Sequence, residues 1–175
     1  NKNGRKDVYE DSAQPVKKRL DDLISQMSVD EKTAQMATLY GYNRVCKDFL
    51  PTESWRTALW KDGTANIDEH LNGYAYFEEK LPGVEYLWPA SKHAWALNEV
   101  QRFFIEETRL GVPAEFTDEG IRGVEALKAT CFPTQLSMGQ TWDRDLIRKM
   151  GEVTGREARA LGYNNVYSPI MDVMR

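Results

Sequence analysis

Histidine and cysteine are scarce in this sequence, and their scarcity argues against whole classes of site. There are 2 His and 2 Cys among 175 residues. Cys46 and Cys131 lie far apart, and with only His70 and His93 to help they form none of the closely spaced ligand patterns of a zinc site. We therefore expect no metal site and no cofactor. A disulfide between the two cysteines is an alternative to two buried thiols, which are the commoner arrangement.

Long apolar runs, excess positive charge and phosphate-binding motifs are also missing. No run approaches the 18 residues of a membrane span, so we expect no membrane partner. The net charge of -4 argues against nucleic acid as a partner. No Walker loop, Gly-x-Gly-x-x-Gly or Gly-x-Ser-x-Gly occurs. No basic and apolar leader opens the chain, so we expect either a cytoplasmic protein or a mature exported one.

The first half of the chain predicts an arm, two helices and a long irregular segment. Residues 1–14 are polar and form a mobile or draped arm. Apolar spacing predicts a helix from Pro15 to Met27, and Ser28 with Glu31 forms a capping box for a helix reaching about Leu39. Residues 40–89 look like an insertion rich in aromatics. These rings either stack on a flat ligand or, in the preferred interpretation, form a satellite core. The aromatics concerned are Trp55, Trp60, Tyr74, Tyr76, Phe77, Tyr86 and Trp88.

The second half predicts a repeated unit of helix, glycine, strand and carboxylate. A helix capped by Ser91 ends near Gly111, and a strand over 113–117 follows and leads to Asp118. A second helix, expected to run from an Asp143 N-cap to Gly162, leads to another apolar run and Asp172. Consecutive units of this kind give parallel strands of an α/β fold. Two parallel strands cannot stand alone, so we expect an incomplete sheet.

The carboxylate pair Asp118 and Glu119 is the candidate site. It follows the buried strand directly, and Gly120 and Gly123 are expected to leave backbone space for a ligand to approach. A solvated acidic turn is the alternative. Residues adjacent on a strand point to opposite faces, so one carboxylate of the pair faces the ligand and the other braces the loop. We expect Asp118 to face the ligand.

Six short sequence motifs, found in order along the chain, resemble those of a known family. The chain from about Gln14 to Arg175 resembles the N-terminal portion of glycoside hydrolase family 3. The motifs are Leu23–Lys32, Arg109–Pro113, Asp118-Glu119-Gly120, Ala129–Pro133, Thr141-Trp142-Asp143 and Gly155–Gly162. The resemblance implies an exo-acting, retaining β-glucosidase or β-xylosidase acting on a β-linked oligosaccharide or aryl glycoside. It also implies that residues 15–175 are part of a (β/α)8 barrel and supply its first two βα units.

The resemblance also assigns roles to the acidic residues. Asp118 matches a residue that binds sugar hydroxyls in the terminal subsite. The nucleophile and the acid/base lie beyond the position matching Arg175, so no catalytic residue is expected in this chain. Asp118 and Asp172 both follow parallel strands, and their spacing does not exclude a catalytic couple. The resemblance argues against this pair, since Asp172 matches a position outside the family's catalytic set, and we expect it to brace a loop.

Two further classes of function stay open. The chain alone would be an inactive carbohydrate-binding product, or an interaction protein that covers its open sheet edge by oligomerising or by binding the rest of the barrel. By analogy with exported family members in Gram-negative bacteria, we expect a periplasmic or secreted protein whose signal has been removed. A cytoplasmic location is the alternative.

Overall fold

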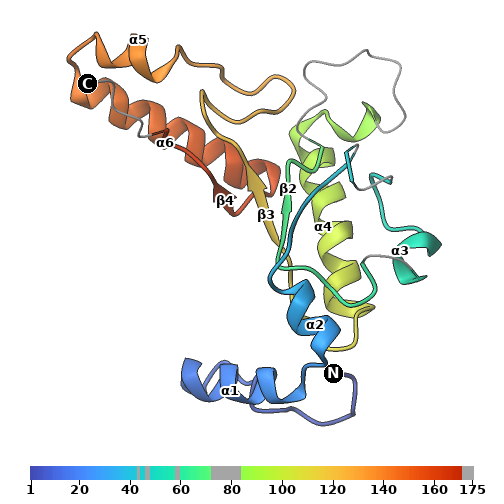
Figure 1. Ribbon diagram of the computed structural model, residues 1–175. Helices are drawn as coiled ribbons and strands as arrows, with labels where there is room; N and C mark the ends of the chain where they lie inside the picture. Colours follow the sequence, from blue (N-terminus) through green and yellow to red (C-terminus); the bar gives the residue numbers. More distant parts are fainter. Residues whose placement is uncertain (43, 46–47, 58–59, 72–83, 171–175) are drawn as a thin grey trace.

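The chain forms an α/β fold around a parallel sheet of four strands in the order β1-β2-β3-β4 (Figure 1). The computed structural model describes residues 1–175 except 43, 46–47, 58–59, 72–83 and 171–175. The strands are β1 (Thr38–Tyr40), β2 (Asn66–Asp68), β3 (Glu115–Asp118) and β4 (Asn165–Val166). Neighbouring strands in the sheet are also consecutive in the chain, so the polypeptide crosses over by one strand position each time.

The helices precede, connect and cover these strands. They are α1 (Val16–Gln26), α2 (Val29–Ala34), α3 (Glu53–Thr57), the 3₁₀ helix η2 (Val84–Tyr86), α4 (Ala90–Glu106), α5 (Gln135–Gly139) and α6 (Arg144–Leu161). The long helices α4 and α6 pack on each other and cover the buried face of the sheet. Figure 1 shows α1 and α2 beyond the amino ends of the strands and α5 at the opposite end of the molecule.

The expectation of two parallel strands is wrong, because the sheet has four. The first two strands, β1 and β2, lie where the sequence predicted a helix end and an insertion. Each has only three residues, too few for a period of two to appear, and β2 carries a single apolar side chain, Ile67. The segment 40–89 therefore supplies an internal strand of the sheet, since β2 pairs with both β1 and β3.

The helix signals were more dependable than the strand signals. The capping box is present: Ser28 accepts from the amide of Glu31, and the Glu31 side chain accepts from the amide of Ser28. However, α2 ends at Ala34, five residues before the expected end. The Asp143 cap on α6 and the left-handed Gly162 after it are also confirmed. Helix α4 differs, because Pro89 takes the N-cap position expected for Ser91 and supplies no side-chain cap.

The core is formed by the apolar face of the sheet and the aromatic residues beside α4. Ile67 of β2 and Phe116 of β3 are register partners, and both are buried against this core. Trp55 stacks on Trp60 with ring centroids 5.3 Å apart, and Trp55 meets Phe103 edge-on at 5.5 Å. Trp55 and Trp60 are thus buried core residues, as preferred, but they belong to the main core and not to a satellite core. By contrast, Trp88 is half-exposed, and the aromatics at 74, 76 and 77 lie outside the described residues.

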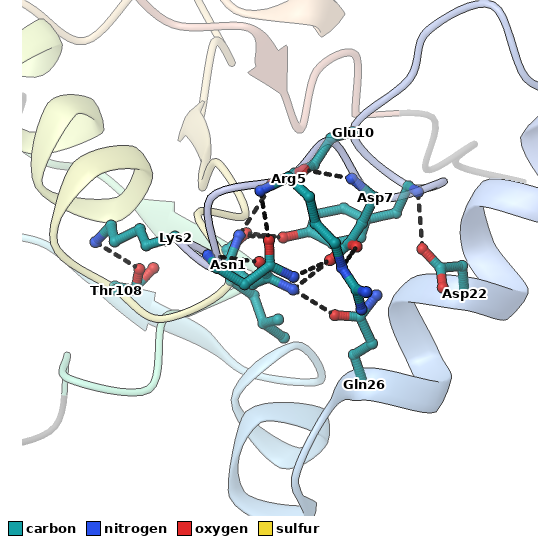
Figure 2. A network of polar contacts seen from close by, with 11 residues as sticks. Asn1, Lys2, Arg5, Asp7, Glu10, Asp22, Gln26 and Thr108 are labelled. Carbon is teal, nitrogen blue, oxygen red and sulfur yellow. Dashed lines mark hydrogen bonds and ion pairs between the residues drawn. The ribbon is translucent and has the colours of Figure 1, made fainter.

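The polar arm 1–14 is draped over the amino end of the fold. Figure 2 shows its contacts: Lys2 Nζ donates to the carbonyl of Thr108 at 3.1 Å, and Asn1 Nδ2 donates to Gln26 Oε1 at 2.7 Å. The hydroxyl of Tyr9 adds a 3.0 Å hydrogen bond to the carbonyl of Leu110. The arm therefore ties α1 to the connection between α4 and β3.

Two further expectations can be compared with the described residues. Cys131 is free and exposed, which corrects the expectation of a buried thiol, because its side chain lies on the loop before α5 instead of in the core. Cys46 lies outside the described residues. In the part of the chain that the structure describes, no helix combines the length and apolar character needed to cross a membrane.

Candidate functional site

The two faces of the sheet differ in chemistry. Leu39, Ile67 and Phe116 are register partners on neighbouring strands and pack into the core beneath α4 and α6. Side chains alternate along a strand, so the residues between these apolar ones point to the other face. That face is polar: Asn66 Nδ2 donates to Glu115 Oε2 at 2.8 Å, and Asn165 and Asn66 both donate to the hydroxyl of Thr117.

At the carboxyl end of β3 this alternation separates Asp118 from Glu119. Asp118 follows Thr117 and pairs in register with Val166, so it lies on the apolar, helix-covered face, where it is fully buried. Its Oδ1 accepts hydrogen bonds from the amides of Gly120 at 2.8 Å and Glu125 at 3.1 Å. Asp118 thereby holds the loop 119–125. Glu119 directly follows the last residue of β3 and is partly exposed.

The two glycines of this loop permit close packing within the protein. Gly123 has φ +97°, and a Cβ there would lie 2.0 Å from the carbonyl oxygen of Thr130. Gly120 has φ +64°, and a Cβ there would lie 3.1 Å from Cβ of Val166. The expectation that these glycines leave room for a ligand is therefore wrong. The space beside them holds the next strand and the following loop.

The neighbouring strand β2 brings more carboxylates to the same end of the sheet. Asp68 is its last residue, Glu69 follows, and both are buried. Burial first, and then the charges of Glu119 and Asp118, raises the pKa of Asp68 to about 6. Burial and the nearby acidic charges likewise raise the pKa of Glu125. The carboxyl ends of β2 and β3 thus carry a cluster of interacting acids.

Arg44 supplies positive charge to this cluster. Its Nη1 lies 2.8 Å from Glu69 Oε2, and its guanidinium lies 4.6 Å from the ring centroid of Tyr40. The charge of Arg44 favours the ionised forms of Asp68 and Glu69, although burial outweighs it in both and their pKa values remain raised. Because Tyr40 ends β1, the cluster extends across the carboxyl ends of three adjacent strands.

A chain of buried hydrogen bonds lies next to the acid cluster and includes Tyr163, His70 and His93. Tyr163 donates its hydroxyl hydrogen to the carbonyl of His70 at 2.8 Å, so its oxygen accepts from His93 Nε2 at 3.1 Å. His70 Nδ1 accepts from the amide of Tyr42, which places the ring hydrogen on Nε2 facing the carbonyl of Phe49. Burial lowers the pKa of each histidine to about 4, so both rings are neutral at neutral pH.

Sequence reasoning found one part of this site and missed another. Asp118 and Glu119 are at the strand end, as expected. Asp68, Glu69 and Arg44 were missed because β1 and β2 were not recognised. The available signal was the short run Asn66-Ile67-Asp68 before Glu69, which is an apolar residue flanked by polar ones at a strand end. The other expected carboxylate, at position 172, lies outside the described residues.

The donor set of this site suits hydrogen bonding to neutral hydroxyl groups. Carboxylates accept hydrogen bonds from sugar hydroxyls, and an arginine donates to sugar oxygens. Among the residues that the structure describes, no group of three His, Cys, Asp or Glu side chains is arranged to hold a metal ion. These residues combine carboxylate acceptors with an arginine donor, a set that can form hydrogen bonds with hydroxyl groups.

Comparison with known proteins identifies the family. The model of the glycosyl hydrolase family 3 N-terminal domain matches residues 84–175. A putative beta-xylosidase of Formosa agariphila is 30% identical over 167 residues, which are 95% of this chain. The chain belongs to glycosyl hydrolase family 3.

Further curated relatives of the chain are much longer than it is. A periplasmic beta-glucosidase/beta-xylosidase of Dickeya chrysanthemi is 25% identical over 99% of the chain. A beta-glucosidase of Rhizobium radiobacter is 36% identical over 38% of the chain. The chain spans 21% of the length of the Formosa protein and 26% of the Dickeya protein. It therefore corresponds to about a fifth to a quarter of these relatives.

Proposed function

We propose that this chain is the N-terminal part of the (β/α)8 catalytic barrel of an exo-acting, retaining β-glycosidase of the β-glucosidase or β-xylosidase type. The observation that supports it is the acid cluster at the carboxyl ends of adjacent parallel strands, in a chain of glycosyl hydrolase family 3. Barrels of this class form their active sites from the loops at that end of the strands. The polar sheet face corresponds to the barrel interior.

Within this subsite the two adjacent acids have different tasks. Glu119 faces the barrel mouth and accepts hydrogen bonds from hydroxyls of the terminal sugar. Asp118 holds the loop that carries Glu119, through its bonds to the amides of Gly120 and Glu125. Direct contact between Asp118 and the sugar, expected from the sequence, stays a prediction that the experiment below tests.

Hydrolysis with retention needs a nucleophile and an acid/base whose carboxyl groups lie about 5 Å apart on opposite sides of the scissile bond. We assign both to parts of the parent protein beyond this chain. The isolated chain then binds sugar weakly and has no turnover. An inactive carbohydrate-binding product would behave in the same way, and it differs from our proposal only in the activity of the parent protein.

The test is binding of methyl β-D-xylopyranoside and methyl β-D-glucopyranoside to the chain, followed by NMR chemical-shift changes, together with hydrolysis of the 4-nitrophenyl glycosides. We expect saturable shifts at the amides of the 119–125 loop and no hydrolysis. Glu119→Gln should abolish these shifts. Asp118→Asn keeps an oxygen that accepts from both loop amides, so it should retain binding if Asp118 braces the loop, and lose binding if the carboxylate contacts the sugar.

Turnover by the isolated chain would overturn the assignment of the catalytic residues to the rest of the protein. No shifts with either glycoside would contradict the subsite.

We also propose that the rest of the barrel covers the outer edges of β1 and β4, and that the protein is periplasmic or secreted, as the name of the Dickeya relative suggests. Sedimentation of the isolated chain tests whether these edges are open. We expect the chain to self-associate through them, and a stable monomer at high concentration would contradict this.

A further inference from the structure

Asp68 occupies a position from which it can act on Glu119. It ends β2 and is the register partner of Thr117 on β3. Glu119 comes two residues after Thr117, directly beyond the end of β3, so Asp68 and Glu119 lie at the same end of the sheet on neighbouring strands. After burial, the charge of Glu119 is the largest cause of the raised pKa of Asp68.

The Asp68 carboxyl group is almost completely enclosed and incompletely bonded. Its exposed fraction is 3%, and its Oδ1 has no hydrogen-bond partner among the residues that the structure describes. A buried ionised carboxylate with an unbonded oxygen is costly, whereas a protonated carboxyl group can donate a hydrogen bond to a neighbouring acceptor. The environment therefore favours a proton on Asp68.

The charges around Asp68 act in the same direction. Glu69 comes directly after β2, and Asp118 and Glu119 come from the end of β3 and the residue after it. Glu125 of the following loop acts on Glu69. Directly after β4 comes the phenol of Tyr167, a neutral group. The cation facing Asp68 is Arg44, which is ion-paired with Glu69. Among the described residues, several acids thus face one arginine, and the pKa of Asp68 is raised to about 6 by burial and by the charges of Glu119 and Asp118.

We propose that Asp68 is a positioning residue that carries a proton and donates it in a hydrogen bond to the Glu119 carboxylate. If both groups were ionised, neither could donate to the other and they would repel. With one proton between them, one oxygen of Glu119 is held by Asp68 and the other faces the mouth to accept from a sugar hydroxyl. This inference rests on the proposed sugar subsite.

The first experiment needs no sugar. Side-chain carboxyl ¹³C shifts of the chain, recorded from pH 3 to pH 9, should show an Asp68 midpoint near 6, above that of an ordinary Asp. Glu119→Gln should bring the Asp68 midpoint down, because one acidic charge is removed. The matched control is Glu53→Gln, which removes an exposed carboxylate on α3 and should leave the midpoint unchanged. An ordinary Asp68 midpoint, or one insensitive to Glu119→Gln, would overturn the proposal.

The second experiment measures binding of methyl β-D-xylopyranoside and methyl β-D-glucopyranoside at pH 5 and pH 8. The wild-type affinity should fall about tenfold at pH 8, where the donated hydrogen bond is lost. Asp68→Asn donates an amide hydrogen at every pH, so it should bind equally at both and tighter than wild type at pH 8. Asp68→Ala should bind weakly at both.

The outcomes separate this inference from the proposed function. A coupled Asp68 titration without sugar binding at either pH supports the Asp68–Glu119 pair and contradicts the sugar subsite. Sugar binding that is equal at pH 5 and pH 8 supports the subsite and contradicts the positioning role. Loss of binding in Asp68→Asn at both pH values would also contradict it, provided the variant keeps the wild-type amide spectrum.

Discussion

Arg109 and Glu31, 78 residues apart in the chain, form an ion pair with Arg109 Nε 2.9 Å from Glu31 Oε1. Arg109 also donates to the carbonyl of Gln26 at 2.7 Å. The same Glu31 accepts from the amide of Ser28 at 2.8 Å and completes the capping box of α2. One carboxylate therefore caps a helix and attaches that helix to the segment between α4 and β3.

Glu31→Ala should lower the free energy of unfolding by about 1–3 kcal/mol, because it removes a helix cap and leaves polar groups at a buried junction unpaired. Glu31→Gln keeps an oxygen that can accept from Ser28, so its loss should be smaller. Urea denaturation followed by circular dichroism measures both changes. Equal losses in the two variants would show that the charge of Glu31, and not the cap, carries the effect.

The same pair predicts a pH dependence. Burial alone would raise the pKa of Glu31, but its bonds to Arg109 and Ser28 outweigh burial and lower it. The carboxylate therefore stabilises the fold at a pH above its unfolded pKa, and this contribution is lost as the pH falls through the lowered pKa. The difference in stability between wild type and Glu31→Gln should shrink toward zero below about pH 4. A difference that is constant with pH would contradict the ion pair.

Gly123→Ala should destabilise the fold by about 2–4 kcal/mol, since the new Cβ would meet the carbonyl of Thr130 and the residue would be held at a positive φ. Gly151 in α6 is the matched control, because nothing lies within 4 Å of a Cβ there. Gly151→Ala should stabilise the fold by about 0.5–1 kcal/mol. Thermal unfolding of the two variants should give midpoint shifts of opposite sign, and a neutral Gly123→Ala would contradict the loop geometry.

Tyr163→Phe should lower the free energy of unfolding by about 1–3 kcal/mol, because the carbonyl of His70 and the ring of His93 both lose a buried partner. Tyr40→Phe is the control, since Tyr40 is 41% exposed. It should change stability by less than about 0.5 kcal/mol. Similar losses in the two variants would show that the buried chain behind the acid cluster contributes little.

The buried histidines predict loss of stability in mild acid. Their pKa values are lowered from 6.5 to about 4 by burial, so their neutral forms stabilise the fold fully above about pH 6.5. This contribution is lost as the pH falls from 6.5 to about 4. Gln cannot gain a charge, so His93→Gln should reduce the slope of the free energy of unfolding against pH in that window. An unchanged slope would contradict the burial of a neutral His93.

Asp118→Ala should loosen the loop 119–125 without unfolding the sheet. The amides of Gly120 and Glu125 lose their common acceptor, so their hydrogen exchange should accelerate about tenfold or more relative to Asp118→Asn, which retains an acceptor oxygen. NMR-detected exchange measures this directly. If exchange is equal in the two variants, Asp118 does not brace the loop.

The sequence by itself determined the local features of this protein and the kind of fold. The capping box at Ser28, the Asp143 cap and the helix end at Gly162 follow from hydrogen bonds within a few residues, so adjacent sequence suffices to predict them. The parallel arrangement and the place of Asp118 at a strand end followed from the alternation of helix, glycine and apolar run.

Only the tertiary structure decided the number of strands and the composition of the acid cluster. A strand such as β2 is too short to show a period and is stabilised by its neighbours β1 and β3, not by its own sequence. The register of these strands places Asp118 on the buried face and Asp68 beside Thr117 on the polar one. Whether an acid braces a loop or faces a ligand depends on pairing with distant segments, and local sequence does not contain that information.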